Sequence, residues 1–120
     1  MPLIRIEMKK GKSPEYRQKL LDCVHSGIME ALGTADWDRF QRIIEIPEEN
    51  FETSPSKSDD FMIIELTLFP GRTKELKAKA IEFITGNLNK ELGIRPEDVF
   101  IVIHEPPFEN WGMAGKQLTE

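Results

Sequence analysis

The sequence of 120 residues contains one cysteine and no long apolar run, and each shortage excludes a class of protein. Cys23 cannot form an internal disulfide. His25 lies two positions further on and points to a different face of a helix, so a Cys–His nucleophilic pair is not expected. A thiol packed in the core is the better interpretation of Cys23. Arg5, Lys9 and Lys12 interrupt the apolar residues of the N-terminal region, which predicts neither a signal peptide nor a membrane span.

The chain also lacks an excess of positive charge. Its formal net charge is -5, and Lys and Arg are spread along the sequence rather than clustered on one stretch. This distribution argues against a nucleic-acid-binding surface, so no nucleic-acid partner is expected. Because neither a signal peptide nor a membrane span is predicted, we expect a cytoplasmic protein without a membrane partner. The two histidines, His25 and His104, have no partners at metal-ligand spacing, so no metal or other cofactor is expected.

A hydrophobic content of 39% in 120 residues predicts a single domain spanning 1–120.

The sequence repeats itself at an offset of sixty positions, which gives pseudo-repeats 2–50 and 62–110. The match is ungapped. It pairs Ile4 with Ile64, Gly11 with Gly71, Leu32 and Gly33 with Leu92 and Gly93, Asp38 with Asp98, and Pro47 with Pro107. Two copies are too few for a solenoid, so the chain is expected to be one supersecondary unit used twice.

Each copy has the pattern strand, helix, strand. In the first copy Ile4, Ile6 and Met8 alternate with other residues at period two, as in a strand with one apolar face. Helices are expected to begin after the capping residues Ser13 and Thr73 and to end at glycines 33 and 93. Their predicted apolar stripes are Leu20, Val24, Ile28 and Leu32 with Leu21 and Ala31, and Leu76, Ala80, Ile84 and Leu88 with Ile81 and Leu92.

Second strands are expected at about Arg39–Ile46 and Val99–Glu105, parallel to the first strand of their copy. The sequence therefore predicts an α+β fold, in which duplicated β-α-β units form a four-stranded mixed sheet with two helices on one face. The polar stretch between the copies predicts a surface loop, and the turn-rich tail "PPFENWGMAGKQLTE" predicts a short hairpin or arm.

Pro2 has no counterpart in the second copy, where Met62 takes its place. A proline at the first residue of a strand is tolerated because it need not donate a ladder hydrogen bond, which is one interpretation. The other requires removal of Met1, which would leave a secondary amine at the chain terminus. Such an amine titrates at about 7.7–8.0 in unperturbed peptides, and partial burial would lower that pKa. A base of this kind suits proton abstraction next to a carbonyl.

Arg72 matches Lys12 of the first copy. If the first strands of the two copies are adjacent and antiparallel, the start of one lies beside the end of the other, and Pro2 lies near Arg72. A guanidinium can bind a carboxylate through two parallel hydrogen bonds and so orient an oxo acid toward the proline nitrogen. The pair predicts a site for a small carboxylate substrate.

Five features occur in one order and in register with the duplication, and these are Pro2, "LLDCVHSGIMEALG", "DRFQ", "GRT" and "ENWGMAG". In these features the chain resembles the tautomerase superfamily. The resemblance is to its long duplicated members, such as malonate semialdehyde decarboxylase, and covers nearly the whole chain. It implies that Pro2 is the catalytic amine, that Arg72 binds the carboxylate, that Asp38 activates water or orients the substrate, and that Trp111 forms an aromatic wall. It also implies a homotrimer. The face of the sheet away from the helices is expected to be mixed, with Leu3 and Ile63 beside Arg5 and Glu65, and an uncovered apolar patch of this kind supports an interface.

The chain departs from the decarboxylases in one respect. They carry two arginines near the end of the third strand, whereas "LFPGRT" keeps Arg72 alone, with Phe69 and Gly71 beside it. Phe69 predicts a larger or less polar substrate. Arg39, replaced by Val99 in the second copy, could serve the site or could be an exposed strand-end charge.

Three functions stay open at this point. The first is a tautomerase that transfers a keto–enol proton on a small 2-oxo acid. The second is a hydratase, decarboxylase or dehalogenase, in which a protonated Pro2 acts as the acid and Asp38 steers water. The third is a non-catalytic trimeric binder of a small ligand. Asp38 and Trp111 have structural interpretations as well, because Asp38 recurs as Asp98 and a tryptophan often serves packing.

Overall fold

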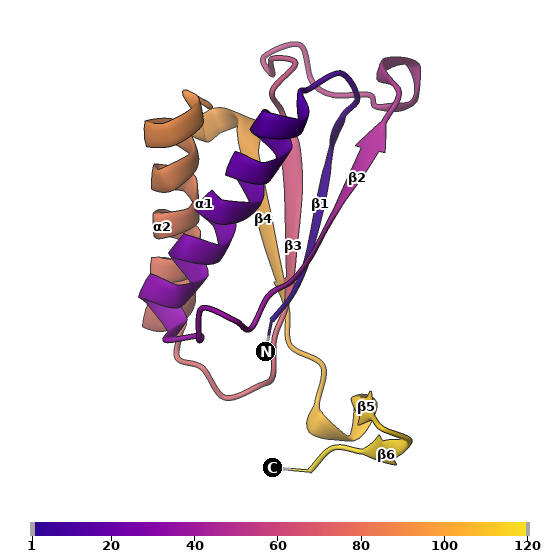
Figure 1. Cartoon of the computed structure of the whole chain (residues 1–120), viewed down its shortest axis with the longest axis vertical. Coiled ribbons are helices and arrows are strands. Elements are labelled where there is room, and N and C mark those ends of the chain that lie inside the picture. The colour runs from indigo at the N-terminus through magenta and orange to yellow at the C-terminus, as the bar shows by residue number, and fades with distance from the viewer. Residues whose placement is uncertain (1, 120) are drawn as a thin grey trace.

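In a computed structural model, which describes residues 2–119, the chain folds into a sheet with two helices on one of its faces (Figure 1). The helices and strands are β1 (Leu3–Lys9), α1 (Pro14–Leu32), β2 (Phe40–Ile46), β3 (Met62–Thr67), α2 (Lys74–Leu92), β4 (Val99–His104), β5 (Gly112–Met113) and β6 (Lys116–Gln117). Short 3-10 helices cover Glu48–Asn50, Pro96–Asp98 and Phe108–Asn110. The predicted α+β fold of two strand–helix–strand units is confirmed.

The helix ends are set by local sequence. Ser13 Oγ accepts a hydrogen bond from the backbone N–H of Tyr16 at 3.1 Å, and Thr73 Oγ1 accepts one from that of Leu76 at 3.2 Å. At the other ends Gly33 and Gly93 adopt positive φ angles of 72° and 67°, which glycine reaches without the steric penalty of a Cβ. The predicted caps are therefore confirmed in both copies.

The sheet has the strand order β2-β1-β3-β4. β1 pairs in parallel with β2, and β3 pairs in parallel with β4. β1 and β3 are antiparallel, with Ile6 opposite Ile64 near the middle of the pairing. The first strands of the two copies are thus adjacent and antiparallel, as the pseudo-twofold arrangement requires.

The core lies between the sheet and the helices. Each first strand buries alternate residues under the helices, and these are Ile4, Ile6 and Met8 from β1 and Met62, Ile64 and Leu66 from β3. α1 contributes Leu20, Val24 and Ile28, and α2 contributes Ala80, Ile84 and Leu88. Cys23 is buried in the same cluster, which confirms the prediction of a packed thiol.

Two predicted core residues of α2 are exposed instead. Leu76 has 36% of its surface exposed and Ile81 has 40%. The buried residues of α2 recur at every fourth position, which makes a narrow stripe. Leu76 lies in the first turn, and Ile81 is turned about 100° away from the stripe residue Ala80, so neither reaches the core.

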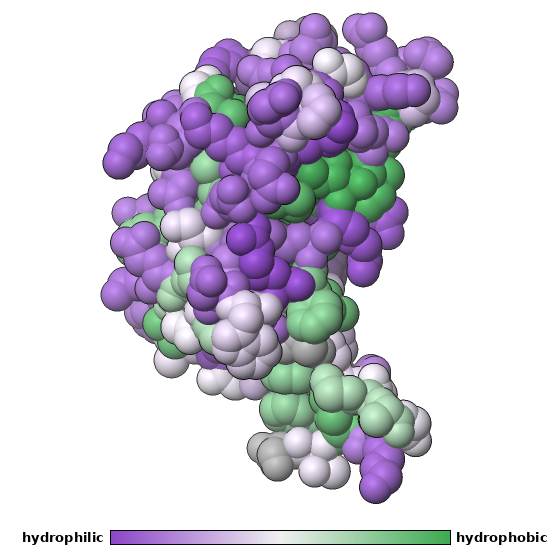
Figure 2. All heavy atoms as spheres, viewed as in Figure 1, coloured by the Kyte–Doolittle hydropathy of each residue, from purple (hydrophilic) through white to green (hydrophobic). Residues whose placement is uncertain are grey.

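The opposite face of the sheet is uncovered in the single chain. It carries Phe40, Phe100 and Val102, which are 53%, 50% and 45% exposed, next to the charged residues Arg5 and Glu65. Figure 2 shows polar atoms spread over the helices, while hydrophobic atoms gather at the side of the body away from them. The mixed face predicted from the sequence is therefore confirmed.

The tail forms the predicted hairpin. β5 and β6 pair in antiparallel fashion around a turn at Ala114 and Gly115, whose φ angles are 53° and 80°. The hairpin projects from the end of the body at which the N-terminus lies (Figure 1). Trp111 lies immediately before it, so the tail begins beside the start of β1.

Candidate active site

The start of β1 lies beside the end of β3. The last pair in their antiparallel register is Leu3 with Thr67, and continuing it by one residue places Pro2 opposite Leu68. Pro2 is buried, and the backbone N–H of Leu68 donates to the carbonyl oxygen of His104 at 2.8 Å. Pro2 therefore adjoins the loop that leaves β3. Met1, whose removal the catalytic interpretation of Pro2 requires, lies outside the described residues.

Arg72 lies in that loop, four residues after Leu68. The preceding Gly71 has a φ of 115°, a conformation that favours glycine. The half-buried Arg72 donates from Nη1 to the carbonyl oxygen of Phe69 at 3.4 Å. Within residues 2–119, no Asp or Glu side chain forms an ion pair with Arg72. Its positive charge is thus available to an anionic ligand, as a carboxylate-binding residue requires.

Aromatic rings form one side of this region. The ring of Phe69 lies 4.7 Å from that of Trp111, centroid to centroid and edge to face, and 5.7 Å from that of Phe108. Trp111 is only 9% exposed, and its Nε1 donates to the carbonyl oxygen of Pro106 at 3.1 Å. A cleft of about 340 Å³ is lined by Trp111 and residues of the hairpin. Trp111 is therefore a packing residue that also lines a cleft.

Phe108 was not predicted as part of this region. In the sequence, Phe108 stands out only as an aromatic residue within the turn-rich tail. Its position depends on the path by which the tail returns to Phe69, and no periodic pattern indicates that path.

Asp38 and Arg39 precede β2, which runs parallel to β1. Because Phe40 pairs with Leu3, these two residues lie at the same end of the sheet as Pro2. The Arg39 guanidinium is directed to α1, however, where Nη2 is 2.8 Å from Oδ1 of Asp22. That hydrogen bond lowers the pKa of the Asp22 carboxyl below its usual range. The structure thus places Arg39 near the site but pairs its charge with α1.

The two aspartates related by the duplication differ in their surroundings. Asp98 is fully buried and is bonded to Ser58 and Arg95. Asp38 is half-buried, and its backbone N–H donates to the carbonyl oxygen of Ala35 at 3.1 Å. The backbone N–H of Asp98 makes the equivalent bond, to the carbonyl oxygen of Arg95 at 2.9 Å, so the two copies share this turn and differ in the burial of the carboxylate.

In the part of the chain from Pro2 to Thr119, no three His, Cys, Asp or Glu side chains are grouped so as to hold a metal ion. No helix in that part is both long and apolar enough to cross a membrane.

Two family models, each described as "Tautomerase enzyme", match residues 2–55 and 38–114. The second match alone covers more than half of the chain. This chain belongs to the tautomerase superfamily. A probable tautomerase of Bacillus subtilis, YusQ, is 31% identical over 127 aligned positions, which cover 100% of both proteins. The tautomerase family is thus matched along the full length of the chain.

Solved tautomerase structures share the fold. FG41 malonate semialdehyde decarboxylase, inhibited by 3-bromopropiolate, is 30% identical with a TM-score of 0.83, over 93% of this chain and 88% of that one. A fused 4-OT described as an asymmetric trimer superimposes with a TM-score of 0.85 at 19% identity, over 96% of this chain and 94% of that one. The protein is accordingly an isomerase or lyase-type enzyme of the duplicated tautomerase type.

Proposed function

We propose that the protein is a tautomerase that uses the amine of Pro2, after removal of Met1, to transfer a proton between carbon and oxygen of a small 2-oxo acid. The observation that carries this proposal is the position of Pro2 beside the end of β3, from which the Arg72 loop departs. Methionine aminopeptidases generally accept proline as the second residue. The resulting secondary amine has no counterpart in the second copy, where Met62 takes the place of Pro2.

The chemistry follows from these positions. Arg72 binds the substrate carboxylate, and Phe69 with Trp111 contacts the rest of the acid. The neutral proline nitrogen accepts a proton from one position of the enol and returns it to carbon, giving the 2-oxo acid, so no other reactant is consumed. The reaction needs no metal or cofactor.

A second candidate is a hydratase, decarboxylase or dehalogenase of a small unsaturated or oxo acid. It is supported by the 30% identity to a malonate semialdehyde decarboxylase and by the half-buried position of Asp38 at the Pro2 end of the sheet. In this reaction a protonated Pro2 is the acid, and Asp38 steers a water molecule. Arg39, paired with Asp22, is proposed to hold the Asp38 segment against α1 rather than to contact substrate.

We also propose that the chain acts as a single domain and as a homotrimer. The uncovered sheet face with Phe40, Phe100 and Val102 supports an interface. The description of a fused 4-OT as a trimer supports the number of copies.

One set of experiments tests the proposal. Intact-mass measurement of protein made without an N-terminal tag should show loss of Met1, because an acylated proline nitrogen has no lone pair to accept a proton. Solvent deuterium should exchange into C3 of a 2-oxo acid in the presence of the enzyme. Activity should rise with pH as Pro2 loses its proton if it is the base, and fall if it is the acid. Retention of Met1 in most molecules, or no exchange at C3, would contradict the tautomerase proposal.

A further inference from the structure

The two copies build the same loop at opposite ends of the sheet. The loop after β1 contains Gly11 with a φ of 125°, and the loop after β3 contains Gly71 with a φ of 115°. The capping residues that follow, Ser13 and Thr73, have the same backbone angles within one degree. Lys12 therefore occupies the backbone position of Arg72.

The strand neighbours are also equivalent. Because β1 and β3 are antiparallel, Met8 at the end of β1 pairs with Met62 at the start of β3. Met62 holds the place that Pro2 holds at the other end. A peptide nitrogen within the chain is no base, so the Lys12 end is a binding position without the catalytic amine.

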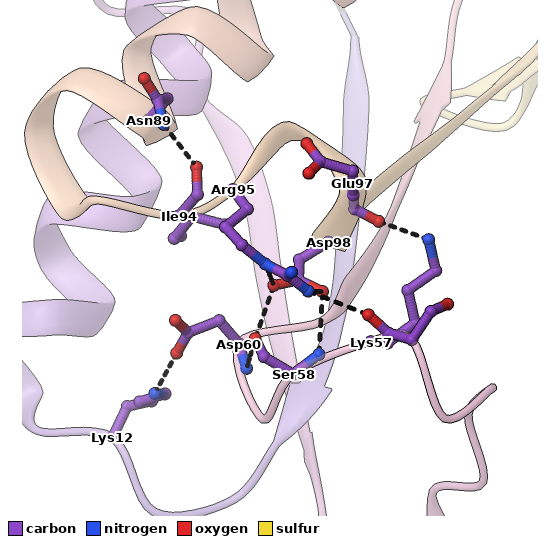
Figure 3. A network of polar contacts seen from close by, with 10 residues as sticks. Lys12, Lys57, Ser58, Asp60, Asn89, Ile94, Arg95, Glu97 and Asp98 are labelled. Carbon is purple, nitrogen blue, oxygen red and sulfur yellow. Dashed lines mark hydrogen bonds and ion pairs between the residues drawn. The ribbon is translucent and has the colours of Figure 1, made fainter.

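A carboxylate already lies at this position. Nζ of Lys12 is 2.6 Å from Oδ1 of Asp60, and Nζ of Lys9 is 3.1 Å from Oδ1 of Asp59 (Figure 3 shows the first pair). Asp60 lies two residues before Met62, in the loop between the copies. Arg72 has no such partner within the described residues. Asp60 is thus placed where the duplication predicts that a substrate carboxylate would lie.

Asp60 is positioned by contacts other than its pair with Lys12. Its backbone N–H donates to Oγ of Ser58 at 3.1 Å, and Ser58 donates from Oγ to buried Asp98 at 2.5 Å. Arg95 donates to both carboxylate oxygens of Asp98 at 3.1 Å, and Lys57 donates to the carbonyl oxygen of Glu97 at 2.6 Å. Figure 3 shows these contacts joining the loop to the segment before β4. The loop would therefore keep its path if the Asp60 carboxylate were removed.

There is space and positive charge beside Lys12. A cleft of about 210 Å³ is lined by Lys9, Lys10, Gly11, Lys12, Glu48 and Asp59. The ring of Tyr16 lies 5.0 Å from Nζ of Lys12 and covers one side of the ammonium group.

We propose that the Lys12 end of the sheet is a second, latent binding site for a small carboxylate, and that Asp60 keeps it occupied from within the chain. The inference rests on the proposed function, because Lys12 is interpreted through its match to Arg72. It assigns Asp60 a role that no periodicity of the sequence indicates, that of an internal competitor for an anionic ligand.

The test is a titration with pyruvate, followed by the backbone amide NMR signals of Gly11 and Lys12 at one end and Gly71 and Arg72 at the other. Wild type should show saturable shifts at the Arg72 end alone. Asp60→Asn should add saturable shifts at Gly11 and Lys12, with an affinity up to about fivefold above that of wild type at that end, since a partly exposed ion pair contributes up to about 1 kcal/mol. Asp60→Ser should behave in the same way.

Glu52→Gln is the matched control, because it removes the same charge from an exposed residue of the same loop that does not line the cleft beside Lys12. It should leave the Gly11 and Lys12 signals as in wild type, and Asp60→Asn combined with Lys12→Ala should lose the new shifts. The inference is wrong if both Asp60 variants keep dispersed spectra yet show no shift at Lys12 while the Arg72 end binds. An equal gain in Glu52→Gln would also overturn it.

The two proposals fail separately. Shifts at Lys12 in Asp60→Asn without any at Arg72 would support the latent site and contradict the proposed carboxylate-binding role of Arg72. An absence of shifts at both ends in all variants would overturn both.

Discussion

Arg72 and Lys12 have equivalent backbone positions but different partners. Arg72 donates to a backbone carbonyl, whereas Lys12 is paired with Asp60. A charge that is already paired within the chain contributes little to binding a further anion. This difference in partners leaves the charge of Arg72, rather than that of Lys12, available to an anion, which is what the proposed function requires.

Arg72→Ala should raise KM strongly for acidic substrates and reduce transition-state binding by about 2–5 kcal/mol, because it removes a charged hydrogen-bond partner. Lys12→Ala is the matched control and should change kcat/KM little. Steady-state kinetics on a 2-oxo acid measure both. Equal losses in the two variants would mean that the copies have not diverged in function.

Asp98 is expected to stabilise the fold. The hydrogen bond from Arg95, with further ones from Ser58, holds the pKa of the Asp98 carboxyl well below its usual range despite burial. Asp98→Asn should lower the free energy of unfolding by about 2 kcal/mol at neutral pH, since buried partners lose a charged acceptor. Urea unfolding of wild type and Asp98→Asn at several pH values measures this effect.

The pH dependence has a defined sign. A carboxyl whose pKa is lower in the folded than in the unfolded protein stabilises the fold above about pH 4, and this contribution is lost as the pH falls toward the folded value. The difference between wild type and Asp98→Asn should therefore shrink in acid. Asp59→Asn, at an exposed residue, should change the unfolding free energy by less than about 1 kcal/mol. A difference for Asp98→Asn that grows as the pH falls would contradict this assignment.

The helices α1 and α2 are in contact at Gly27. A Cβ built on Gly27 would lie 2.9 Å from Cγ1 and 2.9 Å from the backbone nitrogen of Ile84, too close for the backbone of α2 to stay in place. Gly27→Ala should therefore destabilise the protein by about 1–3 kcal/mol, as measured by thermal or urea unfolding. Gly86→Ala is the control on α2, where a Cβ would meet no atom within 4 Å.

Gly86→Ala should be neutral or stabilise the protein by up to about 1 kcal/mol, because alanine is the better helix former. Equal effects of the two substitutions would show that the helices do not approach each other closely at Gly27.

Sequence periodicity and capping chemistry predict most of the helices and strands. Ser13, Thr73, Gly33 and Gly93 mark the helix ends because each satisfies a backbone requirement of a helix terminus. The duplication predicts the pairing of β1 with β3, and hence the approach of Pro2 to the Arg72 loop. Local patterns did not predict the exposure of Leu76 and Ile81, because that depends on how α2 sits against α1.

The contacts within the candidate site are harder to predict from the sequence than the helices and strands. The position of Phe108 against Phe69, the pairing of Arg39 with Asp22 and the contact of Asp60 with Lys12 all join residues far apart in the chain. Each depends on the path of an irregular segment rather than on a repeating pattern. Such contacts follow only once the strands and helices are placed in three dimensions.

The uncovered face of the sheet predicts that the chain assembles with further copies of itself. Val102 is 45% exposed and pairs in register with Glu65 of β3, and Phe100 is 50% exposed on the same strand. A trimer formed through this face should have about three times the chain mass of 13.8 kDa in sedimentation equilibrium. Val102→Asp should dissociate it, because the new carboxylate would lie beside Glu65 and would lose hydration in the interface.

Ile81→Asp is the control for this substitution. Ile81 is 40% exposed on α2, on the helical side of the sheet. Ile81→Asp therefore introduces the same charge outside the proposed interface and should leave the mass of the assembly unchanged. A monomeric wild type would contradict the proposed trimer, and dissociation by Ile81→Asp with Val102→Asp still assembled would place the interface elsewhere. If the Pro2 end is completed by a neighbouring copy, dissociation by Val102→Asp should also lower kcat/KM, whereas a site contained in one chain should keep its activity as a monomer. Sedimentation and kinetics on the same preparation therefore test both the interface and its contribution to the active site.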